Sequence, residues 1–285
     1  MAIDYDKLMQ LDIPAVEQTY DARDAMLYAL GLGLGADPMD LDELGFVYEE
    51  GLAALPMMAN VLGAKGSWVR DMDTGVNYLK VVHGEQALTL HAPLPVAATV
   101  VGKTRVAEIV DKGEGRGALL VGEREITDKA TGTLLATVRQ TIFARDDGGF
   151  GGPTEASRRP AKMPERAPDL TIARTTRPEQ ALIYRLSGDY NPLHADPRVA
   201  EKAGFPRPIL HGLCTFGIGG FAVMKGACGL DPAKLKRLDA RFTSPVFPGE
   251  TLETDLWIEG AEVFFRVRIP AREKVALDNG YAVVG

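Results

Sequence analysis

The sequence has few cysteines and no excess of basic residues, and both shortages narrow the range of functions. Its 285 residues include two cysteines, Cys214 and Cys228, which fit no CxxC or zinc-ligand spacing and give no disulfide framework. Lysine and arginine together number 32 against 39 acidic residues, a formal net charge of −7. A net acidic surface disfavours nucleic acid or an anionic membrane as the main partner. We therefore predict a protein of a reducing, cytoplasmic compartment that binds neither.

A secretory leader and a long hydrophobic run are also missing. The N-terminal sequence MAIDYDKLMQLDIP is acidic where a signal peptide needs a basic start and an apolar core. The most apolar stretch, residues 208–224, contains His211 and four glycines, and it is shorter than the ~20 residues of a membrane span. The final Val-Val-Gly does not form a peroxisomal SKL-type address. These features predict a protein without a membrane anchor.

Apolar periodicity is lacking in one stretch, residues 146–170, which reads DDGGFGGPTEASRRPAKMPERAPDL. A segment so rich in glycine, proline and charge cannot bury enough apolar surface to fold by itself. We predict that it is a linker between an N-terminal domain, residues 1–145, and a C-terminal domain, residues 171–285. Each is long enough for one small domain.

The two halves begin alike. The segment from Thr19 (TYDARDAMLYALGLGLGADP) aligns without a gap with the segment from Thr175 (TTRPEQALIYRLSGDYNPLH), and this alignment pairs Tyr28 with Tyr184. Thr19, and either Thr175 or Thr176, are candidate N-caps of a short amphipathic helix. The match indicates an internal duplication.

The remaining pattern predicts a helix and then several strands in each half. A second apolar helix is expected over residues 52–62 and over 212–226, the latter buried on all sides. Strands are expected over 97–110, 116–127 and 134–144, and then over 250–258, 261–270 and 273–284, with Asn279-Gly280 as a hairpin turn. Helices followed by consecutive strands indicate the α+β class, an antiparallel sheet with helices on one face.

The densest polar cluster in an apolar region lies in YRLSGDYNPLH, residues 184–194. Asn191 followed by Pro192 predicts an N-cap with proline at the first helical position, which places His194 in the first turn and Asp189 just before it. A carboxylate and an imidazole so placed can hold one water and move its protons. Taken singly, Asp189 could instead cap a turn, and His194 could be a buried histidine with satisfied hydrogen bonds.

Downstream, His211-Gly212 stands at the start of the predicted buried helix. Backbone N–H groups there are unpaired and suit an oxygen that gains negative charge. The first half lacks the polar pair: in the gapless alignment Gly33 stands opposite Asp189, and Pro38 opposite His194. We therefore expect the N-terminal copy to accommodate a bulky ligand tail and the C-terminal copy to carry the chemistry.

These motifs resemble the type-2, (R)-specific enoyl-CoA hydratases, a family related to MaoC-like dehydratases and to the hydratase part of peroxisomal multifunctional enzyme type 2. The resemblance covers nearly the whole chain and rests on VVHGEQALTLHAPLP, SGDYNPLHADP, PRPILHGLCTFG and ARFTSPVFPGETLET. It implies a double hotdog fold, in which two antiparallel sheets each wrap a long central helix.

The resemblance also implies roles for individual residues. Asp189 and His194 are similar to the family's catalytic pair, and Gly212 to the glycine whose N–H polarises the thioester carbonyl. Glu49 matches a family Tyr-Glu element that can reach the site from the other half. The residues that match ligand-contacting positions are His83, Gly84, Lys112, Tyr190, Asn191, Pro192, Leu193 and Phe242.

The implied activity is addition of water across trans-2-enoyl-CoA to give (3R)-hydroxyacyl-CoA, or the reverse dehydration. The resemblance implies no metal and no redox cofactor, with CoA as part of the substrate, and a homodimer is expected. Two alternatives stay open: a hotdog thioesterase, in which water attacks the carbonyl, and an acyl-CoA binding protein without catalysis. Which of Asp189 and His194 accepts the water's proton is also open, because spacing fixes proximity and not the order of proton affinities.

Overall fold

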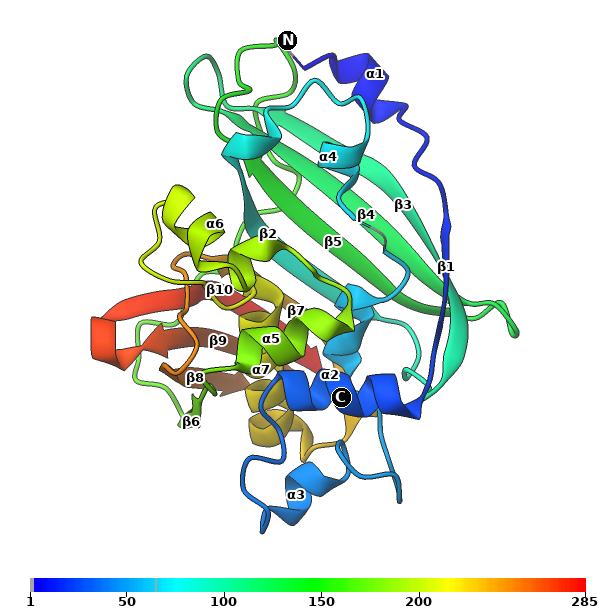
Figure 1. The fold of residues 1–285 in the computed structure, drawn as a ribbon, viewed down its shortest axis with the longest axis vertical. Helices are drawn as coiled ribbons and strands as arrows, with labels where there is room; N and C mark the ends of the chain where they lie inside the picture. Colours follow the sequence, from blue (N-terminus) through cyan, green and yellow to red (C-terminus); the bar gives the residue numbers. More distant parts are fainter. Residues whose placement is uncertain (1–2, 65) are drawn as a thin grey trace.

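One antiparallel sheet organises the molecule. The computed structural model describes residues 3–64 and 66–285, and these form ten strands in the order β1-β3-β4-β5-β2-β7-β10-β9-β8-β6 (Figure 1). The strands are β1 (Val16–Tyr20), β2 (Val81–Leu90), β3 (Ala98–Asp111), β4 (Ala118–Asp128), β5 (Leu134–Ala144), β6 (Leu170–Thr175), β7 (Leu235–Phe242), β8 (Thr251–Glu259), β9 (Glu262–Ile269) and β10 (Lys274–Val284). Together with helices on one side of this sheet, they confirm the predicted α+β class.

The strand order repeats in the two halves. Outward from the centre it reads β2, β5, β4, β3, β1 on one side and β7, β10, β9, β8, β6 on the other, so each strand has a counterpart five places later. Strands β2 and β7 pair at the middle, with Gln86 opposite Ala240. The two expected sheets are therefore joined into one, because this pairing satisfies backbone groups that two separate edges would leave unpaired.

Matched threonines follow the same symmetry. Thr19 of β1 lies opposite Thr99 of β3, and Thr175 of β6 lies opposite Thr251 of β8. In both pairs the hydroxyl oxygens are 2.8 Å apart. The gapless alignment of the two halves thus corresponds to equivalent places in the sheet, as an internal duplication requires.

The helix N-caps differ from the prediction. Because Thr19 lies within β1, the cap of helix α2 (Ala22–Gly31) is Asp21, whose side chain accepts a hydrogen bond from the backbone N–H of Asp24. Thr175 lies within β6, and helix α5 (Gln180–Tyr184) follows Glu179, which makes no capping hydrogen bond through its side chain.

Helix α7 (Gly212–Val223) is the central helix of the C-terminal half, and a π-helical turn (Met224–Cys228) extends it. Most of its side chains are buried, as predicted, and it packs against β7, β8, β9 and β10. A Cβ added to Gly220 would lie 2.7 Å from Leu238 Cδ2, and one added to Gly219 would lie 3.1 Å from Val267 Cγ2. These glycines therefore allow the helix to pack closely on the sheet.

The N-terminal half has no comparable helix among its described residues. The helix predicted over 52–62 is wrong, since only a 3-10 helix (Pro56–Val61) forms there. It begins at a proline and is followed by Gly63, whose φ is +61° and whose backbone lies against Gly102 of β3. The other α-helices are α1 (Tyr5–Met9), α3 (Leu41–Leu44), α4 (Trp68–Asp71) and α6 (Pro197–Lys202), and further 3-10 helices are Tyr78–Lys80, Arg185–Ser187, Pro192–His194, Pro232–Lys234 and Pro270–Arg272.

The predicted hairpin turn at Asn279-Gly280 is also wrong. Both residues lie within β10, where the register with β9 shifts between Leu277 and Gly280. Asn279 has a φ of +53°. An Asn-Gly pair supplies the left-handed backbone that a bulge needs as readily as the one that a turn needs.

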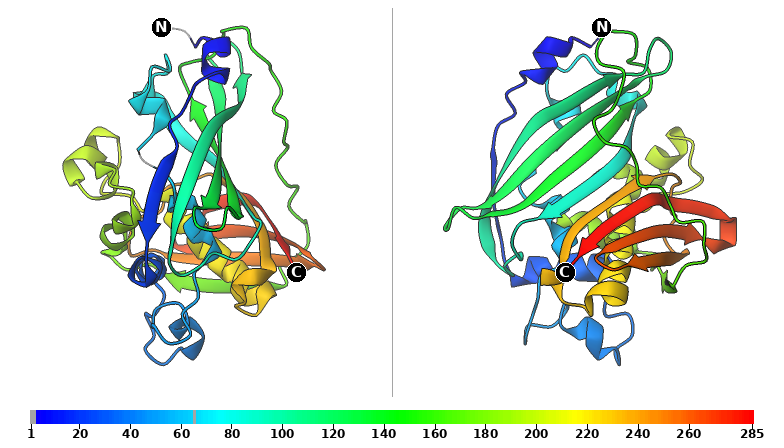
Figure 2. Two further views of the ribbon diagram at one scale, coloured as in Figure 1. Left: turned by 90° about the vertical axis from the view of Figure 1, so that its right-hand side faces the viewer. Right: turned by 180° about the vertical axis from the view of Figure 1, so that it is seen from behind.

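Residues 145–169 form neither helix nor strand and run along the outside of the sheet from one half to the other (Figure 2). Several hydrogen bonds hold this linker segment to the sheet, and two of them lie near its middle. The backbone N–H of Ser157 donates to Glu108 Oε1 at 2.6 Å, and Asn279 Nδ2 donates to the carbonyl oxygen of Ala161 at 2.9 Å.

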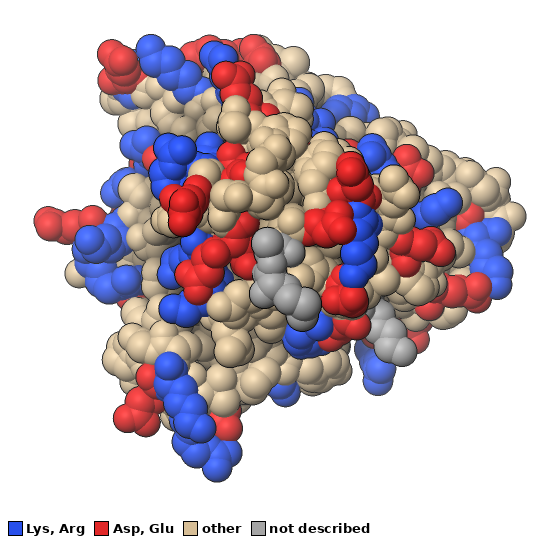
Figure 3. All heavy atoms as spheres, turned by 90° about the horizontal axis from the view of Figure 1, so that it is seen from above, with Lys and Arg blue, Asp and Glu red and all other residues tan. Residues whose placement is uncertain are grey.

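On the face of the molecule in Figure 3, acidic and basic side chains are interspersed, with no large region of one charge. Within the described ranges, the helices are too short or too polar to cross a bilayer.

Candidate active site

The loop that carries Asp189 and His194 is shaped by local hydrogen bonds. The 3-10 helix Arg185–Ser187 ends at Gly188, whose φ is +118°. Asp189 Oδ1 then accepts from the backbone N–H of Asn191 at 3.1 Å, and Asn191 Oδ1 accepts from the N–H of Leu193 at 3.0 Å. The predicted N-cap at Asn191 is confirmed, and it places His194 at the end of one short helical turn.

His194 has a fixed tautomer. Its Nδ1 lies 2.9 Å from the carbonyl oxygen of Ile209, and since a carbonyl only accepts, Nδ1 carries the proton. Burial lowers the pKa of His194 below its ordinary value, so the ring stays neutral near pH 7. Its Nε2 consequently presents a lone pair that can accept a proton.

His211 lies beside His194 and Asp189, and its sequence pattern alone predicted no role for it at the site. Its ring centroid lies 3.8 Å from that of His194, and its Nε2 donates to the backbone carbonyl oxygen of Asp189 at 3.1 Å. Burial, and then the neighbouring His194, lower its pKa to about 4. The sequence feature that could have indicated such a role is the position of His211 immediately before Gly212, the first residue of a buried helix. His211 thus ties the Asp189 loop to the start of α7.

Asp189, His194 and His211 each present one ligand atom, and these atoms lie within 4.8 Å of one another. Two groups that hydrogen-bond one water, each at about 2.8 Å, stand roughly 4.6 Å apart. Two ligands of a tetrahedral zinc ion, each at about 2.1 Å, stand roughly 3.4 Å apart. A trio whose atoms lie within this limit can hold either.

Gly212 begins α7 directly beside this trio. The side chain of His211 makes no capping hydrogen bond, so it does not accept from the first backbone N–H groups of α7. A Cβ added to Gly212 would lie 3.0 Å from Cε1 of Phe242. Glycine therefore lets the aromatic ring and the helix start approach each other.

The inner face of β2 completes the surroundings. The rings of His83 and Phe242 lie 4.4 Å apart between centroids. His83 Nε2 lies 2.9 Å from Gln86 Oε1, while Gln86 Nε2 donates to Asn60 Oδ1 at 2.7 Å. Because the Gln86 amide donates onward, its oxygen accepts from His83, whose pKa desolvation lowers to about 4. Gly84 lies at the bulge between His83 and Glu85.

The other residues that the sequence predicts at the site lie farther from the trio. Tyr190 is 59% exposed, with the Arg185 guanidinium over its ring, and Asn191, Pro192 and Leu193 form the accessible loop beside it. Lys112 follows the end of β3, three strands from β2 in the sheet, or roughly 14 Å at ordinary strand spacing. Glu49 is exposed in the turn before Pro56–Val61. The structure does not bring Lys112 or Glu49 into the trio.

Both halves of the chain match known protein families. The model for the MFE-2 hydratase 2 N-terminal domain matches residues 18–146, and the model for the MaoC-like domain matches residues 159–279. A protein of Arabidopsis thaliana named enoyl-CoA hydratase 2, peroxisomal, is 40% identical over 95% of this chain and 93% of its own. The chain belongs to the MaoC-like hydratase 2 family.

Solved structures extend the comparison to the fold. A MaoC-like dehydratase from Phytophthora capsici superposes on this hydratase 2 family member with a TM-score of 0.89 at 33% identity, covering 99% of this chain and 98% of its own. A Mycobacterium tuberculosis protein described as a double hotdog superposes with a TM-score of 0.57 at 17% identity, covering 96% and 94%. The predicted double hotdog fold is confirmed, with the two sheets joined and, among residues 3–64 and 66–285, one long central helix in place of the expected two.

Proposed function

We propose that the protein is an (R)-specific 2-enoyl-CoA hydratase that adds water across a trans-2-enoyl-CoA and catalyses the reverse dehydration. The observation that carries the proposal is the Asp189, His194 and His211 trio, whose atoms lie within 4.8 Å beside the start of α7. Membership of a family whose relatives are named enoyl-CoA hydratase 2 and 3-hydroxyacyl-thioester dehydratase supports the same reaction.

In the hydration direction, a water held by Asp189 and His194 attacks C3 of the enoyl group. The water's proton passes to His194 Nε2, the nitrogen left unprotonated by the hydrogen bond from Nδ1 to Ile209. Electrons of the double bond move toward the thioester oxygen, whose charge the N–H of Gly212 stabilises. C2 then takes a proton from the Asp189 and His194 pair, so that water is added and both groups return to their starting state.

The substrate contacts are part of this proposal. We assign His83, Gly84 and Phe242 to the wall that faces the thioester and the loop 190–193 to its accessible side. Lys112 would contact a CoA phosphate as a point charge. Glu49 would act only if the acyl chain extends past the 3-10 helix Pro56–Val61.

We propose that residues 1–145 and 171–285 are the two hotdog units and 146–170 their linker. The acyl chain would lie in the N-terminal unit, where Gly33 and Pro38 stand opposite Asp189 and His194 in the gapless alignment. Gly33 has a φ of +87° and packs against Gln180.

The reaction as written needs no redox cofactor and no metal, because proton transfer and an N–H donor supply both steps. We further propose a homodimer that acts in the cytoplasm. Both cysteines are free and buried, which is compatible with a reducing compartment.

The test uses crotonyl-CoA and two readouts. We expect loss of enoyl absorbance without release of free thiol, and chiral analysis of the product should give the (3R) isomer. Release of thiol without loss of the enoyl group would instead identify a thioesterase. Binding of the thioester with neither change would identify a binding protein, and either outcome would overturn the proposal.

A further inference from the structure

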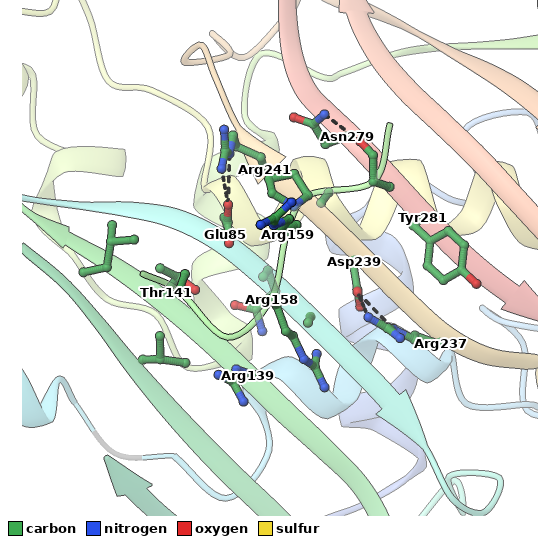
Figure 4. A pocket seen from close by; sticks show the side chains of 18 of the residues that line it. Glu85, Arg139, Thr141, Arg158, Arg159, Arg237, Asp239, Arg241, Asn279 and Tyr281 are labelled. Atoms are coloured by element: carbon green, nitrogen blue, oxygen red, sulfur yellow. Dashed lines mark hydrogen bonds and ion pairs between the residues drawn. The ribbon is translucent and has the colours of Figure 1, made fainter. Parts of the chain in front are cut away.

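A pocket lies on the opposite face of the sheet from the candidate active site. His83 and Gln86 lie on either side of the bulge at Gly84, and their side chains bond to each other and to Asn60 on the helix side. Residues 85–87 of β2 also contribute to a pocket with a cavity volume of about 520 Å³. Linker residues 156 and 158–161 also line it, and they cross in front of the central strands (Figure 4). A pocket of this size is in the range that holds small organic ligands.

The strands contribute charges that are already paired. Five arginines and four acidic residues line the pocket, namely Arg139, Arg158, Arg159, Arg237, Arg241, Glu85, Glu108, Asp239 and Glu262. Arg139 pairs with Glu108 at 2.6 Å, Arg241 pairs with Glu85 at 2.6 Å, and Arg237 pairs with Asp239. Tyr281 donates to Glu262 at 2.5 Å. These pairs leave few strand charges for a ligand.

The two remaining cations come from the linker. Within the described residues, the side chains of Arg158 and Arg159 have no hydrogen bond or ion pair, and Figure 4 shows both at the pocket. Guanidinium groups bind phosphate oxygens in pairs of parallel hydrogen bonds. Two free arginines at one pocket therefore predict an anionic ligand group, and they give a role to linker charges that the catalytic proposal does not use.

The rest of the lining predicts the body of that ligand. Apolar side chains, including Val121 and Phe264, also line the pocket, and Tyr281 lies opposite Asp239 in the strand pairing. Asp239 Oδ1 is buried and has no hydrogen-bond partner, although its Oδ2 is held by Arg237. A buried acceptor without a donor is costly, so a ligand N–H placed there would be bound favourably.

We propose that this pocket binds a purine mononucleotide, with its phosphate on Arg158 and Arg159 and its base between the apolar walls. The exocyclic amine of adenine donates to Asp239 Oδ1. The site is separate from the one that holds the acyl-CoA, because the sheet lies between them. Its occupant therefore binds whether or not the catalytic proposal holds.

The test is calorimetric titration of the full chain with adenosine monophosphate, adenosine and inorganic phosphate. Adenosine monophosphate should bind more tightly than either fragment. The double variant Arg158→Ala/Arg159→Ala should bind it at least tenfold more weakly. Lys162→Ala, which removes an exposed linker charge outside the pocket, should bind it within about twofold of the wild type. All three side chains involved are exposed, and thermal melts check that the variants fold.

Two further measurements test how the bound nucleotide is oriented and in which site it lies. Asp239→Asn should shift preference toward inosine monophosphate, whose base carries a carbonyl where adenine carries the amine. A saturating acyl-pantetheine thioester, which lacks the adenine nucleotide of CoA, should leave the affinity for adenosine monophosphate unchanged. Displacement by the acyl-pantetheine thioester, equal binding of adenosine or phosphate alone, or unchanged affinity in the double arginine variant would each overturn the proposal, and so would an absence of binding.

Discussion

Tyr28 and Tyr184 lie against each other at matching positions of the two halves, with ring centroids 5.9 Å apart and planes inclined at 54°. Both are fully buried, and neither hydroxyl has a hydrogen-bond partner among the described residues. Helices α2 and α5 therefore meet at the axis that relates the two halves through an aromatic contact rather than a polar one.

Replacing either tyrosine with phenylalanine should leave the free energy of unfolding unchanged or raise it. A buried hydroxyl without a partner carries a desolvation cost of about 1–3 kcal/mol, which phenylalanine removes. Tyr28→Ala should instead cost about 3–5 kcal/mol, as for other large aromatic truncations in cores. Urea unfolding measures both, and a loss above about 2 kcal/mol in a phenylalanine variant would show that the hydroxyls are bonded.

Gly212→Ala should lower kcat/KM because the new methyl group would meet the Phe242 ring at 3.0 Å. The φ of Gly212 does not require glycine, so the effect should be steric, and overpacking of this kind costs about 1–3 kcal/mol. Combining it with Phe242→Leu should recover part of the stability lost. Steady-state kinetics and thermal melts test this, and unaltered values for Gly212→Ala would disprove the close approach.

His211 should act as a positioning residue for Asp189. His211→Ala removes the donor to the Asp189 carbonyl and should reduce kcat by about 10- to 100-fold with little change in KM. His211→Gln retains an N–H at a similar reach and should restore part of kcat. Equal kcat values in the two variants would argue that His211 only fills space, as would a change confined to KM.

Stability should fall as the pH falls from about 6.5 to about 4. Burial and desolvation lower the pKa of His83 and of His211 to about 4, and burial also lowers that of His194. The unfolded chain takes up protons near pH 6.5 that the folded chain does not, so unfolding is favoured in this window and unaffected above it. Denaturation midpoints at pH 7.5, 5.5 and 4.5 measure the effect, and a midpoint that is constant or rises on acidification would contradict it.

The lowered pKa of His194 should also appear in the pH dependence of kcat/KM. Because hydration requires neutral His194, the acid limb of the kcat/KM profile should lie below pH 6.5, the ordinary histidine value. A limb at or above that value would show that His194 is not the proton acceptor.

Six strands and the buried helix α7 could be predicted from the sequence because their apolar residues recur at strand or helix spacing. Strands β2 and β7 could not, since His83, Gln86 and Arg241 interrupt the apolar pattern, and their pairing joins residues about 150 positions apart. Asn279-Gly280 was misinterpreted because a bulge and a turn need the same backbone conformation. The pattern DYNPLH predicted the N-cap and the turn around Asp189 and His194 because both are local. The contact with His211, 22 residues from Asp189, depends on tertiary packing.

The proposed catalysis depends most on Asp189 and His194 acting on one water, and turnover of crotonyl-CoA by Asp189→Asn tests this most directly. The variant should keep the wild-type melting temperature and lose about 100- to 10,000-fold in kcat, the range for a positioned acid–base group. Asp12→Asn, a matched change at an exposed carboxylate, should retain wild-type turnover. Full activity in Asp189→Asn would contradict the central claim.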